Sequence, residues 1–170
     1  MPFADLLRAT VFLTAGGATA LAFIAVVGVR DSDNTTILLI GAVWWIVAGW
    51  IGLSLGAADR SHEAMRKTLA EARTITRDSP GEAMPSPNRV AWGRLWPILA
   101  AVGVAGAIGV IFPEVAVVGS GYALLVSLAW RNRESAVLAI EGRDGVRFLV
   151  ESASVLKPVK LVRTPGFRAF

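Results

Sequence analysis

The sequence contains no cysteine and only one histidine among its 170 residues. The chain therefore cannot form a disulfide, hold a cysteine-ligated metal or use a thiolate nucleophile. Charged residues are also scarce, at 18% of the chain, whereas hydrophobic residues make up 54% and the mean hydropathy is +0.57. This balance is too apolar for an ordinary soluble domain and indicates a membrane protein.

Charge is missing altogether from four long stretches of the sequence. No Asp, Glu, Lys, Arg or His occurs in residues 9–29, 37–58, 95–112 or 115–130. Each stretch approaches the roughly 20 residues that an α-helix needs to cross hydrocarbon, and the last is expected to begin at Pro113. Buried helices of soluble proteins usually keep a polar stripe, which these stretches lack. We therefore predict an all-α membrane protein with four transmembrane helices.

The four spans are expected to form two helical hairpins. Between the hairpins we predict a cytoplasmic helical extension followed by a Pro/Ser linker, and after them a basic tail. The predicted segments are a first hairpin 1–58 (spans 9–29 and 37–58), a linker 59–94, a second hairpin 95–130 (spans 95–112 and 113–130) and a tail 131–170.

The distribution of basic residues predicts the orientation. Of the 17 Lys and Arg residues, all but Arg8 and Arg30 fall within 59–94 or 131–170. Basic segments stay on the cytoplasmic side during insertion, and an anionic cytoplasmic leaflet attracts them. We predict a multi-pass protein of the cell membrane with both N- and C-termini in the cytoplasm.

The tail changes from helical to alternating hydrophobicity. Val137 to Glu141 and Val146 to Glu151 flank a glycine-containing tetrapeptide, which predicts a small cytoplasmic β-hairpin over 137–151. Because Val146, Phe148 and Val150 alternate with Arg147, Leu149 and Glu151, one face of the hairpin is expected to be buried. The cover is either the chain itself, through the 59–77 helix or a third strand at 161–162, or a docked partner protein.

Small residues recur at helical spacing in the second and third spans. Such residues let helix backbones approach closely in lipid. They predict a helix-packing interface, which lies either among the chain's own four helices or in contact with a second copy or a partner protein. The residues are Ala48, Gly52, Gly56, Gly103, Gly106 and Gly109.

Few residues suggest a ligand or a reaction. Trp44, Trp45 and Tyr122 lie within spans, where such residues pack between helices, face lipid or line a groove for an apolar ligand. His62, with Asp59 and Glu63 beside it, is explained as the start of a solvated helix, so we predict no catalytic, cofactor or metal site. Acidic residues dilute the positive charge of the tail, which argues against nucleic acid as a partner.

The functional hypothesis follows by elimination. Proton-coupled transporters, voltage sensors and most intramembrane hydrolases rely on ionisable residues within spans, and these spans have none. The sequence favours a small, polytopic, non-enzymatic accessory or scaffold subunit that contacts a partner through its cytoplasmic linker and tail. The alternative is a component of an oligomeric transporter or channel for a neutral or hydrophobic substrate.

Overall fold

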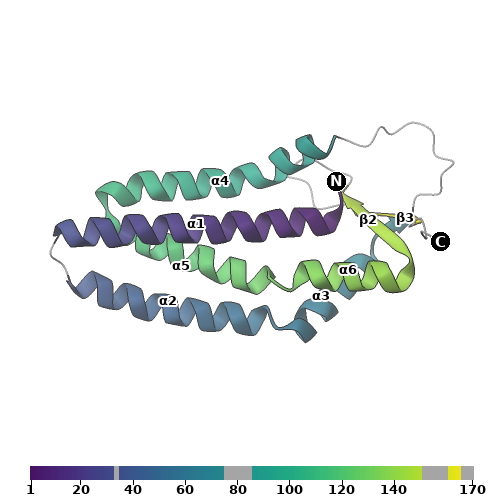
Figure 1. The fold of residues 1–170 in the computed structure, drawn as a ribbon, viewed down its shortest axis with the longest axis horizontal. Helices are drawn as coiled ribbons and strands as arrows, with labels where there is room; N and C mark the ends of the chain where they lie inside the picture. The colour runs from purple at the N-terminus through teal and green to yellow at the C-terminus, as the bar shows by residue number, and fades with distance from the viewer. Residues whose placement is uncertain (33–34, 75–85, 151–160, 166–170) are drawn as a thin grey trace. The chain divides into compact units, whose positions relative to one another are not determined.

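The computed structural model describes residues 1–32, 35–74, 86–150 and 161–165, and these divide into two compact units. Unit 1 comprises Met1–Ala9, Ala58–Trp96 and Asn132–Phe170, and unit 2 comprises Thr10–Ala57 and Pro97–Arg131. The elements, shown in Figure 1, are α1 (Phe3–Ser32), α2 (Thr35–Leu55), α3 (Ala58–Ala70), β1 (Arg73–Thr74), α4 (Pro87–Ile111), α5 (Pro113–Trp130), α6 (Arg133–Asp144), β2 (Val146–Val150) and β3 (Leu161–Pro165).

Four long apolar helices dominate the fold, as the charge-free stretches predict. Within the described residues, four helices are long and apolar enough to cross a membrane. Two of them, α4 and α5, begin at a proline, Pro87 and Pro113. Proline suits the first helical position, because its φ is already helical and its missing N–H would have no intrahelical partner there. These prolines therefore explain where two of the long helices start.

The most extensive backbone approach in unit 2 joins α2 to α5 rather than two helices consecutive in the chain. Gly41 meets Val117 early in the two helices, and Gly52 meets Leu125 and Leu128 near their ends. The contacts advance in the same direction along both helices, so α2 and α5 run parallel (Figure 1). Parallel neighbours cannot be joined by a short turn, and here each comes from a different predicted hairpin.

Unit 1 contains a helical pair as well as strands. Helix α3 is amphipathic and buries Ser61, Met65 and Leu69 at a spacing of four residues, which places them on one face. It packs against α6, whose buried residues are Ala136, Val137 and Ile140. The sequence predicts that the second span continues as a cytoplasmic helix to residue 77. In the structure α2 ends at Leu55, α3 is a separate helix, and residues 75–85 lie outside the described part.

A three-stranded sheet with the order β1-β3-β2 completes unit 1. Strand β3 pairs with β1 in parallel and with β2 in antiparallel register, Phe148 opposite Arg163. The N-terminus adds to the other edge of β2: Pro2 bridges to Leu149, and the Val150 N–H donates to the Met1 carbonyl at 3.0 Å. The outer edge of β2 is therefore partly paired instead of exposed.

The predicted hairpin over 137–151 is only half right. Val146–Val150 forms a strand, but Val137 to Glu141 belongs to helix α6. The tetrapeptide taken for a hairpin turn ends this helix: Gly145 has φ 63°, and its N–H donates to the Glu141 carbonyl as a left-handed C-cap. The strand that pairs with β2 is the more distant β3, so the tail forms a helix followed by a strand.

Candidate functional site

Two tryptophans of α2 hydrogen-bond to α5. The Trp45 Nε1–H donates to the Ser120 hydroxyl at 2.8 Å and approaches the Val117 carbonyl at 3.3 Å, while the Ser120 hydroxyl donates to that same carbonyl at 2.8 Å. The Trp44 Nε1–H donates to the Val118 carbonyl at 3.3 Å. An indole N–H without a partner is costly in an apolar environment, so both bonds favour the association of α2 with α5.

The indole of Trp44 lies directly over the backbone of Gly121. A Cβ added at Gly121 would overlap Trp44 Nε1 and would lie 2.7 Å from Cε2. Trp44 also packs edge-on against Tyr122, with 5.2 Å between the ring centroids. The residues of the predicted apolar ligand groove thus contact one another or α5. The sequence offered no signal that Gly121 faces Trp44, because the two residues are distant in the chain.

Most residues of the predicted small-residue interface pack inside the chain's own helical bundle. Ala48 is fully buried, and Cβ atoms at Gly52 or Gly56 would collide with Leu125 or Leu128 of α5. A Cβ added at Gly106 would contact Ile24 and Leu21 of α1. A Cβ added at Gly109 would contact Ala116 of α5, whereas a Cβ at Gly103 would have nothing within 4 Å. The second span therefore uses its small residues to approach α5.

The apolar face of β2 is covered by the chain itself. Phe148 and Val150 are each only 2% exposed, whereas Val146 is partly exposed. The Phe148 N–H donates to Glu141 Oε1 at 2.8 Å, which ties the strand to α6. Sequence analysis did not assign this role to Glu141, because it placed that residue in a strand. A partner could reach Phe148 only by displacing parts of unit 1.

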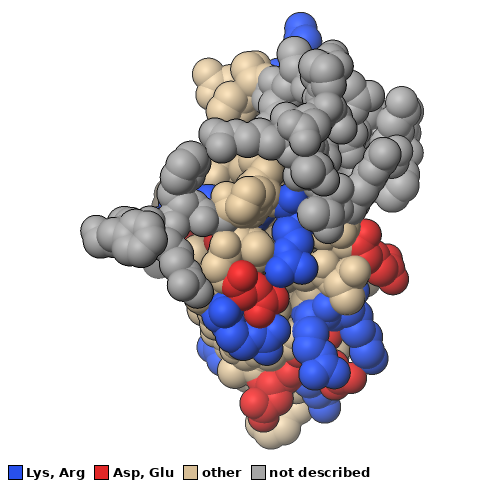
Figure 2. Space-filling view, turned by 90° about the vertical axis from the view of Figure 1, so that its right-hand side faces the viewer, with Lys and Arg blue, Asp and Glu red and all other residues tan. Residues whose placement is uncertain are grey.

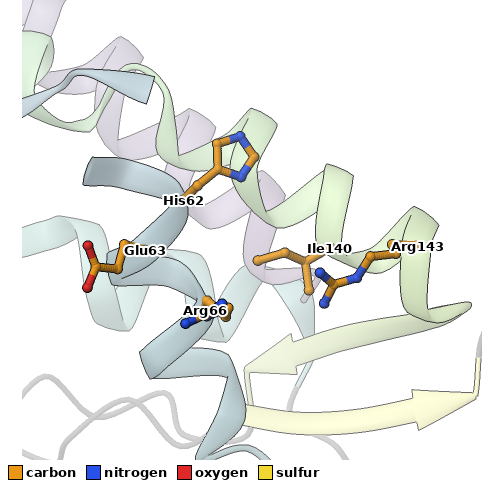
Figure 3. A pocket seen from close by; sticks show the side chains of 5 residues that line it. All are labelled: His62, Glu63, Arg66, Ile140 and Arg143. Carbon is orange, nitrogen blue, oxygen red and sulfur yellow. The ribbon is translucent and has the colours of Figure 1, made fainter. Parts of the chain in front are cut away.

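An open groove of about 390 Å³ lies along α3 and α6 in unit 1. It is lined by His62, Glu63 and Arg66 of α3 and by Ile140 and Arg143 of α6. In Figure 3, Arg143 extends from α6 toward α3 beside Ile140, and Glu63 points away from α6. The groove therefore presents two guanidinium groups from different helices next to an apolar side chain.

Ion pairs hold the acidic groups near this groove in their charged forms. Lys67 Nζ lies 3.0 Å from Glu63 Oε1, and this hydrogen bond lowers the pKa of the Glu63 carboxyl. Arg143 Nε donates to Asp144 Oδ1 at 2.8 Å, which lowers the pKa of Asp144 and raises that of Arg143. In the view of Figure 2, basic and acidic side chains are interspersed over the face turned toward the viewer. The individual pairs are exposed, so each contributes little stability.

The predicted absence of a metal site has not been tested by metal binding. Among residues 1–32, 35–74, 86–150 and 161–165 there is no group of three or more His, Asp or Glu placed to hold a metal ion. A scan against protein-family models found no match for the chain, and neither did searches of curated proteins and of solved structures.

Proposed function

We propose that the protein is a multi-pass membrane protein in which α1, α2, α4 and α5 cross the bilayer. The support is the length and composition of these helices, together with large apolar side chains exposed along them. On α2, Ile46 is 72% exposed and Trp50 76% exposed. Such a surface would be unfavourable in water but matches hydrocarbon, since lipid tails are as apolar as the side chains themselves.

The chain path supports placing unit 1 in the cytoplasm. Helices α1 and α4 begin in unit 1, and α2 and α5 lead into its helices α3 and α6, so each proposed span has one end there. Of the 17 Lys and Arg residues, only Arg30 and Arg131 lie outside unit 1. Basic segments remain inside, so unit 1 and both termini are proposed to be cytoplasmic.

Two tryptophans are suited to mark the inner boundary of the bilayer. Trp92 is 68% exposed and Trp96 54% exposed, and both lie in the part of α4 that belongs to unit 1. Tryptophan is favoured at membrane interfaces because its ring is apolar while its N–H can reach water or headgroups. Their exposure supports a membrane boundary near this part of α4.

Single cysteines test the orientation without interference, since the chain has none of its own. In intact cells, Ser32→Cys should react with an impermeant thiol reagent, whereas Ser86→Cys should react only after the membrane is opened. Opened membranes provide the control that each cysteine is accessible in principle. Labelling of residue 86 in intact cells, or protection of residue 32, would contradict the proposed orientation.

We further propose that the protein is a non-enzymatic accessory or scaffold subunit whose cytoplasmic unit docks another protein. Because Phe148 and Val150 are buried, the docking surface is proposed to lie on the outer side of α6. There Leu138 is 49% exposed, although Ala136, Val137 and Ile140 of the same helix are buried. Leu138 is the exposed apolar side chain through which α6 would contact the partner.

Photo-cross-linking separates protein docking from lipid contact. A photoreactive amino acid in place of Leu138 should yield one cross-linked protein of defined mass. The matched control is the same group in place of Ile46, an exposed apolar position on α2, where only lipid adducts are expected. If position 138 gives no protein adduct in cells, or the same adducts as position 46, the docking proposal is wrong.

A further inference from the structure

The groove between α3 and α6 combines features that favour an anion. Arg66 and Arg143 approach it from different helices, and both are exposed. Two like charges that face one groove repel each other, and a bound anion would relieve that repulsion. The guanidinium group is well suited to this role, because its planar array of N–H donors matches the oxygens of a phosphate.

The acidic groups nearby offset part of the positive charge but leave guanidinium donors available in the groove. Among its lining residues Glu63 is the one acid, and Lys67 already pairs with it at 3.0 Å while the side chain points away from α6 (Figure 3). Asp144 is bonded to Arg143 through Nε, which leaves the two terminal nitrogens of that guanidinium as donors. Arg163 of β3 adds further positive charge near Asp144.

We propose that this groove binds a phosphate-bearing anion, with Arg66 and Arg143 as the phosphate ligands. His62 lines the same groove and supplies a further donor, and Ile140 offers an apolar contact for the rest of the ligand. The inference goes beyond the proposed docking function and does not require a protein partner.

The phosphate has two sources, a phospholipid headgroup or a soluble phosphate compound. Only Gly56 and Ala57 separate the end of α2 at Leu55 from α3, which carries His62 and Arg66. The polar layer on each side of a bilayer is roughly 5–8 Å thick. If α2 crosses the membrane as proposed, α3 follows the end of the span after two residues, so a phospholipid headgroup is one source of phosphate to test.

Binding can be measured on the full-length protein in a neutral detergent by thermal unfolding. Sodium phosphate is compared with sodium chloride at equal ionic strength. In a second arm, bicelles of phosphatidylcholine are compared with bicelles of equal parts phosphatidylcholine and phosphatidic acid. If sodium phosphate raises the unfolding temperature, a soluble phosphate is sufficient as the ligand. If only the bicelles with phosphatidic acid raise it, the ligand is a lipid headgroup.

The variant Arg66→Gln/Arg143→Gln should bind the stabilising anion about tenfold or more weakly, because it loses charge-assisted hydrogen bonds. The control Arg89→Gln/Arg147→Gln removes the same charge from exposed positions of unit 1 outside the groove and should retain the affinity. The proposal is overturned if neither anion stabilises the unaltered protein. It is also overturned if both double variants lose the effect equally, since general screening then explains it.

Discussion

Gly121→Ala is expected to weaken the packing of α2 against α5. The added methyl group would overlap the indole of Trp44, so the ring must move. When the indole moves, its hydrogen bond to the Val118 carbonyl breaks; such a bond contributes about 0.6 kcal/mol in a membrane protein. The indole also loses its edge-on contact with the Tyr122 ring, which contributes about 0.5–1.5 kcal/mol. If the ring cannot move, overpacking costs about 1–3 kcal/mol.

Gly49→Ala is the matched control for this substitution. An added Cβ at Gly49 of α2 would have nothing within 4 Å. Both variants gain the same helix propensity, so that contribution cancels when they are compared. Gly121→Ala should therefore unfold with a free energy about 1–3 kcal/mol lower than Gly49→Ala. The measurement is reversible unfolding of the purified protein by SDS in mild detergent, followed by circular dichroism.

A double-mutant cycle assigns the cost to the indole. In a Trp44→Ala background the added methyl of Gly121→Ala meets no ring, so its penalty should disappear. Equal stability of Gly121→Ala and Gly49→Ala would refute the packing geometry. A penalty that persists without Trp44 would show that something other than the indole resists the methyl group.

Two further substitutions distinguish buried from exposed positions. Gly52→Leu should cost about 3 kcal/mol or more, because even its Cβ would lie 2.8 Å from Leu128 Cβ, whereas Leu55→Ala, at a 49% exposed position, should cost less than about 1 kcal/mol. Equal SDS stability would show that this stripe faces lipid. Phe148→Asp places a charge in the core of unit 1 and should cost about 4 kcal/mol or more, seen as degradation or aggregation, while Arg147→Asp on the exposed side should accumulate normally. Normal accumulation of both would mean that the β2 face is not core.

The long helices were predictable because their signal is local. An uninterrupted apolar stretch of about 20 residues has few alternatives to a helix, since every backbone polar group must find a partner within the segment. The amphipathic face of α3 was equally local, with Met65 and Leu69 four residues apart. Such patterns are recognisable without knowledge of what the face packs against.

Helix α6 was missed because a short apolar pattern does not distinguish a helix from a strand. Val137 and Ile140 fit one face of a helix, but the same few residues also show an alternation. Gly145 strengthened the error, since a glycine with positive φ occurs both in hairpin turns and at helix ends. Strand β3 was expected only as one alternative, a third strand at 161–162, because it lies beyond residues 151–160, a separation that exceeds the span of a local turn signal.

The candidate sites depend on contacts between distant parts of the chain. Trp44 meets Gly121, and the groove joins Arg66 of α3 to Arg143 of α6. Each residue alone has an ordinary explanation: a tryptophan in a span, a glycine in a helix or an arginine on a solvated surface. A candidate site forms only when the packing brings two such residues together, and a single sequence does not show which distant residues pack together.

The pairing of α2 with α5 also bears on how the chain assembles. These parallel helices come from opposite halves of the sequence, and the indole N–H groups of Trp44 and Trp45 find their partners on α5. If these helices cross the bilayer as proposed, the first half alone would leave two donors without those acceptors in an apolar environment, which is costly. In unit 1, α3 and α6 are likewise drawn from segments that follow α2 and α5. Each compact unit is therefore built from segments of both predicted hairpins.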